Sequence, residues 1–232
     1  MYKTILLKLS GEALGSKEGP YDFKFIDYLA KQIKDIRKKG IKIGIVCGGG
    51  NICRGRTFEK LGMKRPDSDY VGMTATVMNS EVLASALKQN KVKTAVLTSF
   101  PVNKVDNYSK AKALKLLKAG NVVIFGGGTG KPFCSTDKAC AQKANDISTD
   151  VILFAKNGTD GVYDSDPRKN KNAHKFDELT FSDIMKLKLE VIDYDAAKIC
   201  QKNNIKGFVF DMAKKDSIKN AALGKINGTI IK

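Results

Sequence analysis

The chain has 232 residues, 42% of them hydrophobic, and a formal net charge of +17. This composition provides a sizeable core for one large α/β domain or two small ones. No stretch approaches the roughly 20 apolar residues that a membrane crossing needs. The N-terminal apolar run is also too short for a signal peptide, so the sequence excludes a membrane protein and predicts a cytoplasmic one.

The positive charge indicates either a nucleic-acid-binding surface or a site for anionic ligands. The excess is mostly Lys, spread along the chain, with only five Arg. Because Arg dominates the planar recognition of phosphates and bases, the lysines are more typical of solvated faces, and nucleic acid is not an expected partner. The five cysteines are odd in number and form no CxxC pair, which favours reduced thiols over disulfides or a zinc site.

Strand and helix patterns alternate along the chain. Short apolar runs predict strands at residues 4–9, 43–47, 94–98, 122–125, 151–154 and 208–210. Helical spacing and capping residues predict helices around 26–36, 70–87 (as one helix or two), 110–119, 137–146, 182–187, 195–203 and 217–223. This alternation is typical of parallel βαβ units. We therefore expect one α/β domain over residues 1–232. An alternative arrangement of this domain is two lobes that face each other across a cleft.

Three predicted strands end in glycine-rich or Ser-Gly turns. These turns lie at Lys8–Gly11, Gly48–Asn51 and Gly126–Gly130. Glycine lets backbone N–H groups approach an anion closely, and the following helix N-terminus adds favourable partial charge. Ligands of open α/β sheets bind at the carboxyl ends of the strands. Three such turns, one of them carrying a Lys, predict a phosphate-binding site there.

Two common nucleotide signatures are absent from the sequence. The P-loop pattern fails around Gly130-Lys131, because Phe125 stands at its first Gly position and Pro132 replaces Ser or Thr. The sequence also contains no GxGxxG dinucleotide fingerprint. The predicted phosphate site is therefore of another kind.

The candidate residues favour phosphoryl transfer over hydrolysis. The single histidine, His174, lies in a polar stretch and belongs to no Ser-His-Asp or Cys-His arrangement that we can identify. Phosphoryl transfer needs mainly positioning and neutralisation of charge by Lys, Arg and Mg²⁺. A phosphate acceptor is largely ionised at neutral pH and needs no general base. Four aspartates are candidate carboxylates of this site: Asp69, Asp137, Asp166 and Asp193. Each of them could instead be a helix cap or a solvated residue.

Five segments together resemble the motifs of bacterial uridylate kinases, members of the amino acid kinase family. They are Lys8–Leu14, Gly48–Gly55, Thr74–Asn79, Thr129–Asp137 and Asp160–Pro167, in the same order and spacing. The resemblance spans essentially the whole chain. It implies a three-layer αβα sandwich with a mainly parallel central sheet, assembled as a homohexamer. It also implies Mg²⁺-dependent phosphoryl transfer from ATP to UMP, giving ADP and UDP for pyrimidine nucleotide biosynthesis.

The resemblance also implies roles for individual residues. Lys8, Arg54 and Asp137 would be catalytic, and Asp137 would help to organise Mg²⁺. The residues implied for ATP are Lys8, Leu9, Ser10, Gly11, Gly50, Arg54, Asn157, Tyr163 and Asp166. Those implied for UMP are Gly49, Asp69, Thr129, Gly130, Lys131, Pro132, Phe133, Cys134, Ser135 and Thr136. Asp193 resembles a family aspartate near the phosphates.

One segment departs from the family pattern. Residues 13–23 lack the Gly-Phe-Gly-type sequence that many relatives carry, and Pro20-Tyr21 breaks it. That region is linked to GTP activation in the family, so the departure argues against activation by GTP. Two alternatives to the whole interpretation are kept: a kinase of the same fold that acts on a carboxylate or carbamate, and a basic nucleic-acid-binding or regulatory protein.

Overall fold

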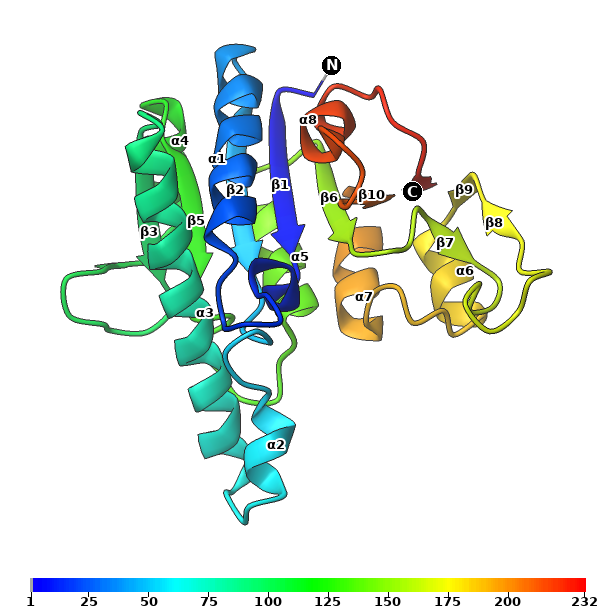
Figure 1. The fold of residues 1–232 in the computed structure, drawn as a ribbon, viewed down its shortest axis with the longest axis horizontal. Helices are drawn as coiled ribbons and strands as arrows, with labels where there is room; N and C mark the ends of the chain where they lie inside the picture. The colour runs from blue at the N-terminus through cyan, green and yellow to red at the C-terminus, as the bar shows by residue number, and fades with distance from the viewer. Residues whose placement is uncertain (1) are drawn as a thin grey trace.

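The computed structural model describes residues 2–232, apart from the side chains of residues 55 and 56. A nine-stranded sheet runs through the middle of the molecule in the order β4-β3-β5-β2-β1-β6-β10-β11-β9 (Figure 1). Its strands are β1 (Thr4–Leu9), β2 (Lys42–Cys47), β3 (Thr94–Thr98), β4 (Asp106–Asn107), β5 (Val122–Gly126), β6 (Val151–Lys156), β9 (Glu178–Leu179), β10 (Lys206–Asp211) and β11 (Thr229–Ile231). Every neighbouring pair is parallel except β10 with β11.

Helices cover both faces of this sheet. One face packs against α1 (Phe23–Lys38), α3 (Arg65–Gln89) and α8 (Ser217–Ala222), and the other against α4 (Lys110–Lys118), α5 (Thr136–Asp146), α6 (Phe181–Lys186) and α7 (Tyr194–Lys202). The remaining elements are η1 (Gly11–Leu14), α2 (Gly55–Glu59) and a small ribbon of β7 (Val162–Tyr163) with β8 (Lys175–Phe176). The molecule is thus the expected three-layer αβα sandwich.

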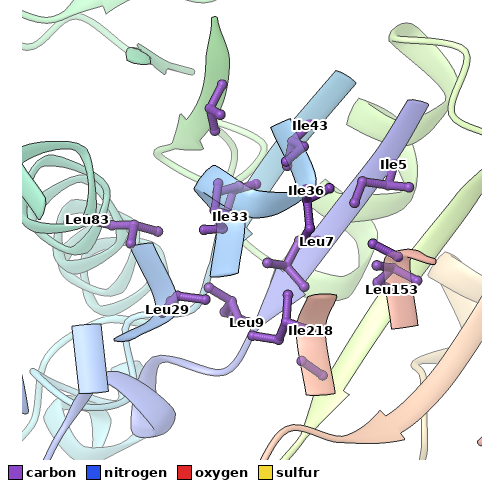
Figure 2. Close-up of a cluster of buried hydrophobic side chains, with 14 of the residues drawn as sticks. Ile5, Leu7, Leu9, Leu29, Ile33, Ile36, Ile43, Leu83, Leu153 and Ile218 are labelled. Carbon is purple, nitrogen blue, oxygen red and sulfur yellow. The ribbon is translucent and has the colours of Figure 1, made fainter. Parts of the chain in front are cut away.

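The side chains of β1 alternate between the two faces of the sheet, and both faces are covered by helices. Leu7 and Leu9 point to the α1 face, where Figure 2 shows them beside Leu29 of α1 and Ile218 of α8. Leu6 points the other way, into the core under α5. All three side chains are 0% exposed. A strand that is buried on both faces must be mainly apolar, and in β1 only Lys8 interrupts the run from Ile5 to Leu9.

The long helix α3 resolves an alternative left open by the sequence. Residues 70–87 lie within one helix, Arg65–Gln89, whose N-terminal part extends with α2 beyond the carboxyl ends of the central strands (Figure 1). The sequence did not predict η1, α2, β4, the β7–β8 ribbon, β9 or the antiparallel β11. Within residues 2–232, no helix combines the length and apolar character that crossing a membrane requires.

Candidate active site

The strand order brings the three glycine turns to one edge of the sheet. Strands β5, β2, β1 and β6 are consecutive neighbours and parallel. Their carboxyl ends therefore meet, and the turns that follow β1, β2 and β5 lie side by side. The prediction that these turns form one site at the carboxyl end of the sheet agrees with this arrangement.

Close backbone contact between the first two turns requires glycine. A Cβ atom on Gly11 would lie 2.5 Å from both the carbonyl oxygen of Gly48 and the amide nitrogen of Gly50. The Gly48 N–H donates to the Leu9 carbonyl at 3.0 Å, which continues the pairing of β1 and β2 into the turns. We call Gly48–Gly50 the triglycine loop. Its approach to Gly11 leaves backbone N–H groups of both turns near one point, as a phosphate cradle needs.

A buried pair of amides fixes the triglycine loop. Asn79 of α3 is 0% exposed and donates to the Gly48 carbonyl at 2.6 Å. Asn79 and Asn51 also bond each other reciprocally, at 2.7 and 3.0 Å. Asn51 in turn donates to the Pro20 carbonyl at 2.7 Å. Both asparagines lie inside the sequence motifs without a role predicted for either, and their hydrogen bonds show that they position the loop.

The centre of the site is an ion pair between β1 and α5. Lys8 Nζ lies 2.8 Å from Asp137 Oδ1, and the two side chains are only 14% and 16% exposed. Burial opposes the charge on Lys8, but the charge of Asp137 and its hydrogen bond outweigh burial and raise the pKa of Lys8. Burial likewise opposes the charge of Asp137, but Lys8 prevails and lowers the pKa of that carboxyl group. Both groups are therefore charged at neutral pH.

The start of α5 sets the direction of Asp137. Ser135 is the N-cap, and its hydroxyl accepts from the Lys138 N–H at 2.9 Å. The alternative that Asp137 caps this helix is wrong, because Asp137 lies in the first turn, from which its side chain reaches Lys8. Asp193 caps α7, accepting from the Ala196 N–H at 2.8 Å, and it also accepts from the Ser135 hydroxyl. The helix-cap alternative thus holds for Asp193, which also ties α7 to α5.

A second lysine, which the sequence analysis missed, lies beside this pair. Lys156 ends β6, and its ammonium group donates to the Val191 carbonyl at 2.7 Å. Burial, together with the nearby charge of Lys8, lowers the pKa of Lys156 to about 8, although Asp137 opposes the shift. The signal in the sequence was a Lys at the end of a buried apolar strand, next to the first glycine-turn strand.

The third turn forms a tight loop that is tied to α3. Asp69 of α3 accepts from the Phe133 N–H at 2.7 Å and from Arg65 at 2.9 Å. Gly130 has a φ of +74°, and a Cβ there would lie 2.7 Å from the Ser99 carbonyl oxygen. The Lys131 N–H donates to the Thr129 hydroxyl at 3.2 Å. The structure therefore brings Asp69 together with the 129–136 loop, as a shared ligand pocket requires.

Two of the three residues expected to seat adenine and ribose lie around a separate cavity of about 450 Å³. Tyr163 and Asp166 line it, together with Lys156 and residues 187–191. The Tyr163 hydroxyl donates to Asp160 at 2.7 Å, and Asp166 accepts two bonds from Arg168. This volume is within the range of small-molecule sites. Asn157 is exposed, and the residues that line the cavity do not include it.

The side chains of two residues expected in the ATP site do not contact the Lys8–Asp137 pair. Arg54 is 69% exposed and pairs with Glu12 on η1, at the rim of the first turn. The Leu9 side chain is 0% exposed and belongs to the core, so only its backbone faces the turns. His174 is exposed in the loop before β8, far along the chain from the ion pair, and no catalytic triad forms around it among the described residues.

The arrangement suits charge neutralisation more than acid–base chemistry. Two lysines and one aspartate meet at the ends of β1 and β6, beside two glycine turns. Among residues 2–232, no group of three or more His, Cys, Asp or Glu side chains is gathered as a metal cluster. Lysines, an aspartate and glycine turns are the kinds of group that bind phosphates and stabilise developing charge in phosphoryl transfer.

Known proteins share both the sequence and the fold. The chain matches the amino acid kinase family over residues 3–211. A uridylate kinase of Mycoplasmopsis pulmonis is 45% identical over 233 aligned positions, covering 99% of this chain and 96% of that protein. A UMP kinase structure from Bacillus anthracis has a TM-score of 0.96 at 36% identity, covering 100% and 96% of the two chains. Another from Ureaplasma parvum has a TM-score of 0.95 at 38% identity, covering 100% and 99%.

Proposed function

The chain belongs to the amino acid kinase family, and we propose that it is a uridylate kinase, which transfers the γ-phosphoryl group of ATP to UMP. The observation that carries this proposal is the buried Lys8–Asp137 pair at the meeting point of the glycine turns. The end-to-end likeness to uridylate kinases supports the choice of acceptor. The reaction supplies UDP to pyrimidine nucleotide biosynthesis.

In this reaction an oxygen of the UMP α-phosphate attacks the γ-phosphorus of ATP. The bond from that phosphorus to the β–γ bridging oxygen breaks, and ADP leaves with the electron pair. The acceptor oxygen is already ionised at neutral pH, so the site needs no base to remove a proton. This requirement matches a centre that has no histidine near it.

Lys8 is proposed to contact the transferring phosphoryl group. Its ammonium is held at one position by Asp137 and is charged at neutral pH. Backbone N–H groups of Ser10, Gly11 and Gly50 would bind the neighbouring phosphate oxygens. Preorganised donors of this kind act strongly in a partly buried site, because they need no reorientation as charge develops. Arg54, exposed at the rim, would turn from Glu12 to the phosphates when the nucleotides bind.

The donor and acceptor pockets follow from the two remaining regions. The 450 Å³ cavity beside Tyr163 and Asp166 is assigned to adenine and ribose, with Asn157 at its exposed margin. The acceptor is assigned to the loop of residues 129–136 together with Gly49 and Asp69. Asp69 already accepts a hydrogen bond from that loop, so the sugar hydroxyl groups of UMP would share or replace it.

The residues present are compatible with Mg²⁺. This ion binds nucleotides through one or two carboxylates plus substrate phosphates and waters. Asp137 is a largely buried carboxylate whose lowered pKa keeps it ionised, so it would hold the ion. When bound, Mg²⁺ neutralises charge on the phosphates. Lys8 would position Asp137 for that role.

Two further expectations are proposals of the same kind. Both ends of the chain contribute strands to one sheet, which supports a single domain over residues 1–232. A homohexamer is proposed from the family resemblance, and light scattering of the purified protein tests it. The net charge of +17 is the one feature that favours a nucleic-acid-binding protein, and its lysines are spread along the chain. The likeness to uridylate kinases over the whole chain favours UMP over a small-acid acceptor.

The direct test of the proposal identifies the product. Purified protein is incubated with MgATP and UMP, and the nucleotides are separated by anion-exchange chromatography. Formation of UDP and ADP in equal amounts is expected. Hydrolysis of ATP without UDP, or no turnover by folded protein, would contradict the assignment.

A further inference from the structure

Lys156 is a partly buried cation that no expected role accounts for. It follows the apolar run of β6, and its side chain direction is fixed by strand register. Lys8 of β1 is paired with Phe154 of β6. Side chains two residues apart on a strand share a face, so Lys156 points to the same face as Phe154 and Lys8. That face is the one covered by α5, which carries Asp137.

The ammonium group of Lys156 has no direct anionic partner in the part of the chain that the structure describes. Asp137 is paired directly with Lys8, and no ion pair joins Lys156 to a carboxylate among the described residues. Lys156 is held instead by a neutral acceptor, the Val191 carbonyl at 2.7 Å. Asp137 and the nearby charge of Asp193 both act on Lys8, whereas Lys156 has no carboxylate bonded directly to it within residues 2–232. Burying a cation next to another cation is unfavourable unless an anion joins them, and the lowered pKa of Lys156 reflects this cost.

The position of Lys156 indicates which anion would bind it. Lys156 lines the cavity that contains Tyr163 and Asp166, and it interacts electrostatically with the Lys8–Asp137 pair. It therefore lies between the proposed nucleoside pocket of the donor and the proposed point of phosphoryl transfer. A triphosphate that spans these two regions passes the ammonium group of Lys156.

We propose that Lys156 is a second catalytic lysine, which binds oxygens of the β- and γ-phosphates of the donor nucleotide and stabilises the charge that gathers on ADP as it leaves. This inference rests on the proposed function. The Val191 carbonyl holds the ammonium group in place before the nucleotide binds. The alternative is a structural role, in which Lys156 only ties β6 to the segment before α7.

The test compares Lys156→Met, Lys156→Arg and the control Lys206→Met. Lys206 is exposed at the opposite end of the neighbouring strand β10, so its replacement removes the same charge away from the site. We measure kcat, the KM values for ATP and UMP, and the thermal midpoint. Dissociation constants of ADP and adenosine are measured by calorimetry, because adenosine fills the nucleoside pocket without phosphates.

For Lys156→Met we expect kcat/KM for ATP to fall roughly 10²- to 10³-fold, the usual effect of losing one donor to developing charge. ADP binding should weaken by about tenfold or more, the scale of a hydrogen bond to a charged group, while adenosine binding stays unchanged. Lys156→Arg should recover part of both losses, and Lys206→Met should behave as the unmodified protein.

Equal weakening of ADP and adenosine, or a lower thermal midpoint with normal kinetics, would overturn the proposal in favour of a structural role. The ADP and adenosine measurements need no UMP. If the unmodified protein binds ADP but does not phosphorylate UMP, the proposed function fails while the role of Lys156 in phosphate binding is still decided. If the unmodified protein does not bind ADP, both proposals fail.

Discussion

Replacing Lys8 by Met removes the ammonium group from the Lys8–Asp137 pair and keeps most of the aliphatic volume of the side chain. The Asp137 side chain is only 16% exposed in the intact pair, so the variant leaves its carboxylate in a largely buried position. Its carboxylate loses its direct partner. Only Lys156 and a backbone hydrogen bond from Asp193 still favour its charge.

The structure allows a magnitude for this change. Removing one partner of a buried pair typically costs about 3–5 kcal/mol, and the remaining charge of Lys156 favours the lower end, about 3 kcal/mol. A second substitution, Asp137→Asn, removes the stranded charge, so the double variant should regain about 2 kcal/mol relative to Lys8→Met. Activity should not return, because kcat falls roughly 10²- to 10³-fold when one donor to the transition state is lost.

The sign of the pH dependence follows from the two pKa shifts. Asp137 has a lowered pKa in the folded protein, so it contributes stability above its unfolded pKa of 3.8 that is lost as the pH falls through the folded value. Lys8 has a raised pKa, so its contribution is fully present below 10.5 and is lost only as the pH rises through the folded value. The stability gap between the unmodified protein and Lys8→Met is therefore greatest near neutral pH and narrows in acid.

The free energy of unfolding is measured by urea denaturation at several pH values from neutral to acid. The proteins compared are the unmodified protein, both single variants and the double variant. Steady-state assays of the same proteins give kcat. Near-normal kcat in folded Lys8→Met would remove Lys8 from the catalytic assignment. Strictly additive losses of stability in the double variant would refute the argument that the two groups compensate each other.

Three further predictions concern the turns, a buried lysine and the acceptor loop. Gly11→Ala places a Cβ 2.5 Å from backbone atoms of the triglycine loop, so kcat/KM should fall about 10²-fold. The control Gly19→Ala has nothing within 4 Å of its Cβ and should keep normal kinetics. Equal effects of the two substitutions on kcat/KM would contradict the phosphate cradle. Lys143 is 6% exposed, and burial lowers its pKa to about 8. The unfolded chain therefore binds the proton of this lysine more tightly than the folded protein does. Lys143→Met removes this cost and should raise the free energy of unfolding at pH 7 by about 1–3 kcal/mol. The stability gained by Lys143→Met should shrink as the pH rises from about 8 towards 10.5. A lower free energy of unfolding for this variant in urea denaturation at pH 7 would contradict the prediction. Cys134 lies partly exposed in the 129–136 loop, so UMP should slow its alkylation by iodoacetamide as followed by mass spectrometry; an unchanged rate at saturating UMP would remove this loop from the acceptor site.

The sequence predicted the layers of the fold because the inner strands β1, β2, β5 and β6 are buried on both faces along most of their length. β1 runs over Thr4–Leu9 as expected, and its mainly apolar run has only one physical explanation in a chain of alternating elements. Short edge elements escaped prediction for the opposite reason. β11 spans Thr229–Ile231 and pairs antiparallel with β10, and three residues carry too little pattern to reveal a partner.

The candidate site was predicted where local sequence carries the signal. Glycine turns and Lys8 can be recognised from a few adjacent residues, but the contact of Asn79 with the Gly48 carbonyl joins residues 31 positions apart. Lys156 was missed because the expected strand ended at Phe154, and one more Lys in a Lys-rich chain is indistinguishable from a surface residue. Only the register between β1 and β6 shows that it shares a face with Lys8.

The most direct test of the central claim is the choice of acceptor. ADP formation from MgATP is followed with UMP, CMP, dUMP, AMP and carbamate supplied separately to the purified protein, and kcat/KM is compared among them. We expect turnover confined largely to UMP, with UDP as the product. Preferred transfer to carbamate or another small acid would keep the fold and the Lys8–Asp137 centre, but it would contradict the uridine pocket and the phosphate acceptor on which the assignment depends.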